Sequence, residues 1–160
     1  MTDAIIDTNV LLTSSHADPD SPFDGTDHLT AEQCLQVMNW LLDFVASDAH
    51  IVFDEDFKIY EEYRNKMSDQ DLGLIAIHRK LESELLRTHI IDYDTSGFAT
   101  VPDAFAQLDR SDRKFLAVAI KDLETGHESE IINATDTDDW QKIAVPCTEH
   151  GIAIRHLLEE

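Results

Sequence analysis

Short apolar runs alternate along the chain with longer segments in which apolar residues recur at helical spacing. Apolar runs of a few residues predict strands buried on both faces, and apolar residues three or four apart predict amphipathic helices. The predicted strands cover residues 4–6, 51–53, 89–93, 130–135 and 151–156. One predicted helix begins at residue 8, and the others cover residues 31–46, 57–67, 72–88, 111–126 and 140–144. Strands that alternate with helices favour an α/β fold with three layers, α/β/α, around a central parallel sheet of about five strands.

Two helices carry clear signals at their ends. The segment Thr30-Ala31-Glu32-Gln33 is a capping box and predicts the start of a helix that runs to about Ala46. Ser111 predicts the N-cap of the later helix, and Gly126 predicts its end. The predicted apolar face of the first helix consists of Leu35, Met38, Leu42 and Val45. The short helix near residues 140–144 is expected to stop before Pro146.

Length and composition indicate one folded unit. The chain has 160 residues, 42% of them hydrophobic, which is the size of one ordinary domain with enough apolar residues for a core. The sequence contains no internal repeat and no linker rich in Gly or Pro. We therefore expect a single domain over residues 1–160. Residues 14–29 predict an acidic surface loop, since they include two Pro, one Gly and four Asp.

The net charge of the chain limits the classes of partner that we expect it to bind. Twelve Lys and Arg against 33 Asp and Glu give a formal net charge of −21. This argues against binding nucleic acid or an anionic membrane through a basic surface, because such binding needs clustered cations. It does not exclude a nucleic-acid enzyme that reaches phosphates through bound metal ions. An acidic surface is also an adaptation to high salt, where screening weakens self-repulsion.

Cysteine use and apolar run length predict the compartment. Cys34 and Cys147 are far apart and outside any CxxC pattern, which favours a reducing environment. The first residues are acidic, unlike a secretory signal, and no run of about 18 apolar residues occurs. We expect a cytoplasmic protein with no membrane partner.

Four acids stand where an α/β fold places its chemistry. Asp7 and Asp136 follow predicted strands, and ligands of open α/β sheets bind at the carboxyl ends of strands. Asp112 lies in the first turn of an amphipathic helix, and Glu62 lies on the helix after the second strand. Carboxylates brought together repel one another unless protons or cations neutralise them. Hard oxygen ligands suit Mg²⁺ or Mn²⁺, and two such ions form the common phosphodiesterase arrangement.

Alternatives remain open for these acids. Asp112 also suits a role in stabilising the helix dipole, and Asp109 lies one turn away and is able to replace it. Asp136 also suits an N-cap, and either Asp138 or Asp139 is placed to assist it.

The second acidic segment is ambiguous as well. Glu61 competes with Glu62, and either is spaced to pair with Lys58 or Lys66 on an exposed helix face. Asp7 is the hardest to explain by packing alone, since it directly follows an apolar strand.

The order of these acidic segments resembles that of the PIN-domain nucleases. Ile5–Leu12 is similar to the opening strand and first acid of that family, and Glu62-Tyr63 is similar to its Glu segment. Asp112–Ala119 resembles the third acidic motif, and Ala134–Trp140 resembles the fourth. The resemblance spans nearly the whole chain.

The resemblance implies a PIN-like domain that hydrolyses RNA phosphodiester bonds with Mg²⁺ or Mn²⁺. The implied metal ligands are Asp7, Glu62, Asp112 and Asp136, with Asp138 as a helper. The implied supporting or phosphate-contacting residues are Thr8, Asn9 and Thr135. The compact basic cluster of Arg110, Arg113 and Lys114 either holds the substrate backbone or lies on the surface at a helix start. Many small members are toxins of toxin–antitoxin pairs (the VapC-like group), so an antitoxin partner and a homodimer are also implied.

Two other classes compete with this interpretation. The first is a catalytically silent PIN-like scaffold or regulatory protein whose acidic surface binds a basic partner. The second is another acid-based α/β protein, a phosphatase or a receiver domain. The second is disfavoured because no DxDxT motif and no acidic pair follows the first strand.

Overall fold

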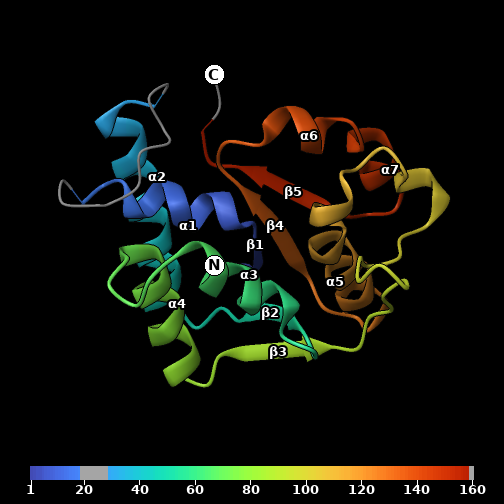
Figure 1. The fold of residues 1–160 in the computed structure, drawn as a ribbon, viewed down its shortest axis with the longest axis horizontal. Helices are drawn as coiled ribbons and strands as arrows, with labels where there is room; N and C mark the ends of the chain where they lie inside the picture. The colour runs from blue at the N-terminus through green and yellow to red at the C-terminus, as the bar shows by residue number, and fades with distance from the viewer. Residues whose placement is uncertain (19–28, 159–160) are drawn as a thin grey trace.

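Five parallel strands form the central sheet of the computed structural model, which describes residues 1–18 and 29–158 (Figure 1). The strands are β1 (Asp3–Ile6), β2 (Ile51–Asp54), β3 (Leu86–His89), β4 (Ser129–Asn133) and β5 (Ala153–His156). Their order is β3-β2-β1-β4-β5, and every pair is parallel. The order reverses between β1 and β4, which places the topological switch point at the carboxyl ends of these two strands.

Helices cover both faces of this sheet. Before β3 come α1 (Thr8–Ser15), α2 (Ala31–Ala46), α3 (Lys58–Lys66) and α4 (Leu72–Glu82). After it come the 3₁₀ turns η1 (Asp103–Phe105) and η2 (Arg110–Asp112), and then α5 (Arg113–Glu124), α6 (Thr137–Gln141) and α7 (Ala144–Glu149). Figure 1 shows α1, α2 and α4 to one side of the sheet and α5 and α7 to the other. The expected three-layer α/β/α fold is confirmed. No helix in the described part of the chain is long and apolar enough to cross a membrane.

The capping box of α2 is confirmed, but its predicted apolar face is wrong. The Gln33 backbone N–H donates to Thr30 Oγ1 at 3.1 Å, and the Thr30 N–H donates to Gln33 Oε1 at 2.9 Å. The buried residues are Cys34, Val37, Leu41 and Phe44, whereas Leu35 and Leu42 are 50% and 43% exposed. The helix carries two neighbouring apolar stripes. Only packing against α1 and α4 selects the one that faces the core.

The predicted boundary between α4 and β3 is also wrong. The helix ends at Glu82, not at residue 88, and the strand covers Leu86–His89 rather than residues 89–93. Glu84 takes a left-handed conformation, with φ of 60°, and this reverses the chain without a glycine. The apolar residues that follow the end of α4 still fit a helical spacing, so the sequence pattern predicted a longer helix. Pairing of this segment with Ile51–Asp54 in the sheet decides the outcome.

The last helices differ from the prediction as well. The strand β4 ends at Asn133, three residues before Asp136, and α6 and α7 replace the single predicted helix at residues 140–144. Pro146 lies inside the first turn of α7 instead of beyond a helix end. A first-turn residue has no N–H bond to lose, so proline is tolerated there.

The helix α1 extends into the segment that was predicted to be an acidic loop. The helix continues to Ser15, and the hydroxyls of Ser14 and Ser15 donate to the Leu11 carbonyl at 2.8 and 2.9 Å. The predicted loop therefore starts too early; its residues 19–28 lie outside the described part. At Gly73 on α4, an added Cβ would lie 2.4 Å from the Leu11 carbonyl oxygen, so only glycine allows this close approach of α4 to α1.

Ser111 does not cap α5 as predicted. The helix begins at Arg113 after η2, and the Ser111 hydroxyl donates instead to Asp109 Oδ2 at 3.3 Å. The predicted end is confirmed, because Gly126 has a φ of 86° and its N–H bonds to the Leu123 carbonyl at 3.0 Å. The 3₁₀ turn is an extra element that leaves the Asp112 side chain without a capping bond.

A buried ion network joins α5 to β3. Asp122 is fully buried and accepts two hydrogen bonds from Arg87, at 2.7 and 3.0 Å, and its Oδ1 lies 2.6 Å from His89 Nε2. Arg87 also bonds to Asp3 at 2.8 Å. Burial opposes the charged carboxylate, but the bonds from Arg87 and His89 outweigh this and lower the pKa of Asp122. The network ties the strand β3 at the sheet edge to the helix beneath it.

We expect Asp122→Asn to lower the free energy of unfolding by about 3 kcal/mol, because it leaves the half-buried Arg87 charge without its main partner. Urea denaturation measures this. The control is Glu124→Gln, two residues further along the helix, where the side chain is 62% exposed and only a surface pair with Lys121 is lost. Equal stability of the two variants would show that the network does not hold β3 in place.

Candidate metal centre at the carboxyl ends of β1 and β4

Three acids from distant parts of the chain meet at the switch point of the sheet. Asp7 directly follows β1, Asp136 lies three residues beyond β4, and Asp112 ends η2. One carboxylate oxygen from each lies within 4.8 Å of the other two. The position agrees with the general place of ligand sites in open α/β sheets. Of the four acids expected to form one metal-binding group, the geometry brings these three together.

Asp7 is the buried member of this group, with an exposed fraction of 3%. Its Oδ2 accepts a hydrogen bond from Trp140 Nε1 at 2.9 Å, and its Oδ1 accepts one from the Asn9 backbone N–H at 3.3 Å. Burial first, and then the charge of Asp112, raise the pKa of Asp7 to about 7 from an ordinary value of 3.8, and the Trp140 bond offsets part of this. Near neutral pH this carboxyl is therefore poised between its two forms.

Asp112 and Asp136 are half-buried and have raised pKa values for the same reasons. Burial, followed by the charge of Asp136, raises the pKa of Asp112 to about 7. Burial and the charge of Asp139 raise the pKa of Asp136. Neither side chain caps a helix. Across residues 1–18 and 29–158, no Lys, Arg or His forms an ion pair with any of the three acids. The site is thus a set of hard oxygen donors whose mutual repulsion a divalent cation would relieve.

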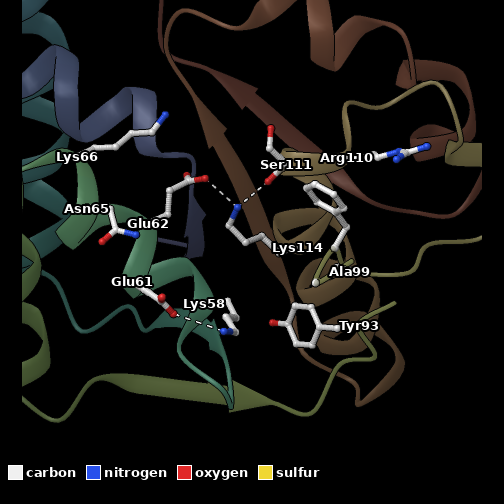
Figure 2. Close-up of a pocket in the computed structure, with 12 residues that line it drawn as sticks. Lys58, Glu61, Glu62, Asn65, Lys66, Tyr93, Ala99, Arg110, Ser111 and Lys114 are labelled. Carbon is white, nitrogen blue, oxygen red and sulfur yellow. Dashed lines mark hydrogen bonds and ion pairs between the residues drawn. The ribbon is translucent and has the colours of Figure 1, made fainter. Parts of the chain in front are cut away.

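Glu62 lies beside this group but is not part of it. Its Oε2 accepts a hydrogen bond from the Thr8 hydroxyl, and its Oε1 accepts one from Lys114 Nζ at 2.8 Å. Figure 2 shows Lys114 on α5 pointing toward Glu62 on α3. The charge of Glu62 still contributes to the raised pKa of Asp112. Glu61 instead pairs with Lys58 at 3.6 Å, so Glu62 is the acid of this segment that faces the centre.

The other acids considered from the sequence lie outside the group of three. Asp138 is exposed in the first turn of α6, and Asp139 pairs with Lys142 at 2.7 Å. Asp109 is exposed before η2. These acids add negative potential around the centre, as the effect of Asp139 on Asp136 and of Asp109 on Asp112 shows. Of the two candidates, Asp112 is the one that the fold turns inward.

Asn9 joins the two strands that carry the acids. Its side-chain oxygen accepts hydrogen bonds from the backbone N–H groups of Ala134 at 2.8 Å and Thr135 at 3.1 Å, and its Nδ2 donates to Asn133 Oδ1 at 3.0 Å. Asn133 Oδ1 also accepts from the Asp136 N–H at 2.9 Å. The implied supporting role of Asn9 therefore has a physical form: it holds the loop that carries Asp136. The sequence pattern predicts neither the role of Asn133 nor the Trp140 bond to Asp7, because no local pattern distinguishes these residues from ordinary core residues.

The two basic residues next to Asp112 have separate tasks. Arg113 donates from Nε to the Leu108 carbonyl at 3.1 Å and from Nη2 to the Ala106 carbonyl at 2.9 Å. It thereby holds the loop before η2. Lys114 is shared between Glu62 and the Ser111 carbonyl, at 2.8 and 2.6 Å. In this structure Lys114 contacts the candidate centre through Glu62, while Arg113 is engaged with the backbone.

We expect Trp140→Phe to weaken Mn²⁺ binding by about 10-fold to 100-fold, because it removes the N–H that orients Asp7 and retains most of the packing. Calorimetric titration with Mn²⁺ measures the change. The matched control is Trp40→Phe on α2, since the buried Trp40 Nε1 has no hydrogen-bond partner in the described structure. If both variants bind Mn²⁺ like the unchanged protein, the bond from Trp140 does not orient a metal ligand.

Comparisons of this chain with protein-family models, with curated proteins and with solved structures gave no match, so the resemblance to PIN-domain nucleases stays a prediction.

Proposed function

We propose that this protein is a metal-dependent endoribonuclease that hydrolyses RNA phosphodiester bonds. The observation that carries the proposal is the meeting of Asp7, Asp112 and Asp136, with ligand atoms within 4.8 Å of one another, at the switch point of an α/β sheet. Acids gathered at such a cost in repulsion serve a purpose other than stability. The order of the four acidic segments adds the PIN-domain resemblance to this geometry.

The donor set fits Mg²⁺ or Mn²⁺, which bind a few carboxylates and keep other positions for water and phosphate oxygens. When bound, such an ion supplies charge neutralisation at the phosphate and a water that loses its proton more easily. Asp7, Asp112 and Asp136 would hold it. Trp140 orients the Asp7 carboxylate, and Asn9 holds the loop that carries Asp136. Thr8 and Lys114 hold Glu62 at the edge of the centre, where it would position the attacking water.

The test combines calorimetry and a cleavage assay on the unchanged protein. We expect Mn²⁺ to bind in the millimolar range or tighter and to raise the melting temperature, because it binds the folded state alone. We also expect cleavage of RNA with Mg²⁺ or Mn²⁺, and none with EDTA, measured across a range of salt. Metal binding without cleavage of any RNA would reject the nuclease and keep the metal centre.

The net charge of −21 favours a second candidate, a PIN-like scaffold without activity that binds a basic protein. Absence of Mn²⁺ binding at millimolar metal would favour this candidate.

The toxin form of our proposal also requires a basic partner, which is an antitoxin that silences the nuclease. We include a homodimer in the proposal on the basis of the resemblance. We assign the activity to the cytoplasm because Cys34 and Cys147 are both free and buried.

A further inference from the structure

A groove lies beside the candidate metal centre, between α3 and the segment from Tyr93 to Ser111 (Figure 2). Its volume is about 320 Å³. Glu62 and Lys114 form part of its wall. Because Glu62 accepts a hydrogen bond from the hydroxyl of Thr8, the residue next to Asp7, the groove adjoins the centre. A strand bound with one phosphate at the acids would pass into it.

The groove gathers an unusual share of the positive charge of the molecule. Four of the twelve Lys and Arg residues line it, and two acids line it with them. The four cations are Lys58, Lys66, Arg110 and Lys114, and the acids are Glu61 and Glu62. Four minus two leaves a local charge of +2, on a chain whose net charge is −21. This is the sign that a phosphate backbone requires.

Two of these cations form no salt bridge in the described part of the chain, although the charge of Lys66 also acts on Asp136 at the candidate centre. Lys58 pairs with Glu61, and Lys114 pairs with Glu62. Lys66, on the last turn of α3, and Arg110, at the start of η2, form no ion pair with any residue of the described ranges, and both are exposed. They lie on opposite sides of the groove in Figure 2, with the Arg110 side chain extending outward. They are therefore available to contact backbone phosphates at the two sides of the groove.

One wall of the groove is aromatic and held in place. Tyr93 donates a hydrogen bond to the buried Asp54 at 2.6 Å, and Asp54 also accepts the backbone N–H groups at the start of α3. Phe98 follows a turn in which Asp94 accepts the Phe98 N–H at 3.0 Å, and Gly97 has a φ of 86°. Both rings are only partly buried. The Tyr93 ring is held by its hydroxyl and the Phe98 backbone by its turn, and partly exposed rings of this kind are stacking surfaces for a nucleobase.

We propose that this groove binds a single-stranded segment of the RNA substrate next to the phosphate that is cut. Lys66 and Arg110 contact phosphates, and Phe98, which lines the same groove as Tyr93, stacks on a base. The inference rests on the proposed function for the identity of the substrate. The strand is single because a base reaches an aromatic ring only when it is unpaired, and because a cavity of about 320 Å³ is at the small end of ligand sites.

The experiment measures binding of a short fluorescein-labelled oligouridylate by anisotropy in Ca²⁺, an oxygen-seeking cation, with the oligomer checked for cleavage on a gel. The double variant Lys66→Gln with Arg110→Gln is expected to weaken binding about tenfold at low salt. It is also expected to reduce the slope of log affinity against log salt by about 1.4, since two phosphate contacts are lost. The control, Arg79→Gln with Lys121→Gln, removes the same charge from exposed sites outside the groove and should change neither quantity.

Two further measurements separate stacking from charge. Phe98→Ala is expected to weaken binding about tenfold, and Phe98→Tyr should restore it because it keeps the ring. In Mn²⁺ the groove variants should raise KM for RNA while kcat changes little, and Phe98→Ala, which carries no charge, should leave the calorimetric Mn²⁺ affinity unchanged. A labelled RNA duplex should bind at least about tenfold more weakly than the single strand.

The outcomes distinguish the groove from the metal centre. If the unchanged protein binds Mn²⁺ and cleaves RNA, but the groove variants behave like the control, this inference is wrong and the proposed function stands. If the protein binds no Mn²⁺, the proposed function fails, and loss of oligouridylate binding in the groove variants still decides for the groove. Equal binding of duplex and single strand, or no binding of RNA at all, overturns the inference.

Discussion

Asp112→Asn is expected to reduce Mn²⁺-dependent RNA cleavage about a thousandfold, to background. The change removes one charge and one ligand from the group of three acids, and metal stabilisation of the transition state contributes several kcal/mol. Asp7→Asn should have the same effect, because its carboxylate is the buried member of the group. The measurement is the initial rate on single-stranded RNA at saturating Mn²⁺.

Folding and metal affinity should respond in opposite directions in this variant. Without metal, Asp112→Asn removes a charge that raises the pKa of Asp7, so the melting temperature in EDTA should rise or stay the same. With Mn²⁺ the gain in melting temperature should shrink, because the ion has lost a ligand.

Asp109→Asn is the matched control for Asp112→Asn. It removes the same charge one turn away, from an exposed side chain outside the group, and should keep most of the activity. Full activity in Asp112→Asn, or loss in Asp109→Asn alone, would move the site to Asp109. Full activity in both Asp7→Asn and Asp112→Asn would reject the assignment of the centre.

The second large effect is a fall in the stability of the metal-free protein as pH rises from about 4 to about 7. The folded state holds a proton on Asp7 up to a pKa of about 7, whereas the unfolded chain releases it near the ordinary value of 3.8. Between these values the folded state binds more protons, so the free energy of unfolding decreases as pH increases. For Asp7 the change is about 4 kcal/mol, and it is complete above about pH 7. Asp112 acts in the same direction.

Urea denaturation in EDTA at a series of pH values measures this. The difference between the unchanged protein and Asp7→Asn isolates the contribution of the carboxyl, because the amide does not titrate. Saturating Mn²⁺ should remove most of the dependence, and Mn²⁺ affinity should increase through pH 7 as the ligands lose their protons. A stability difference that stays constant from pH 4 to pH 8 would contradict the raised pKa of Asp7.

The sequence by itself determined the local features of this protein. Apolar runs predicted the strands β1, β2 and β5, and the capping box predicted the start of α2, because these signals act between residues a few positions apart. The alternation of strands and helices determined the three-layer class. It also placed Asp7 at the end of β1, because the acid directly follows the strand along the chain.

Only the tertiary structure decided which residues meet. The choice between two apolar stripes on α2 depends on what α1 and α4 present to it, and β3 begins at Leu86 because that segment pairs in register with β2. Helical spacing along the sequence does not distinguish Glu62 from Glu61. Contacts with Thr8 and Lys114 in the folded protein hold Glu62 beside the three acids. Trp140 reaches Asp7 across 133 positions of chain. Such contacts depend on strand order and helix packing, which determine distances in space that local patterns along the chain do not encode.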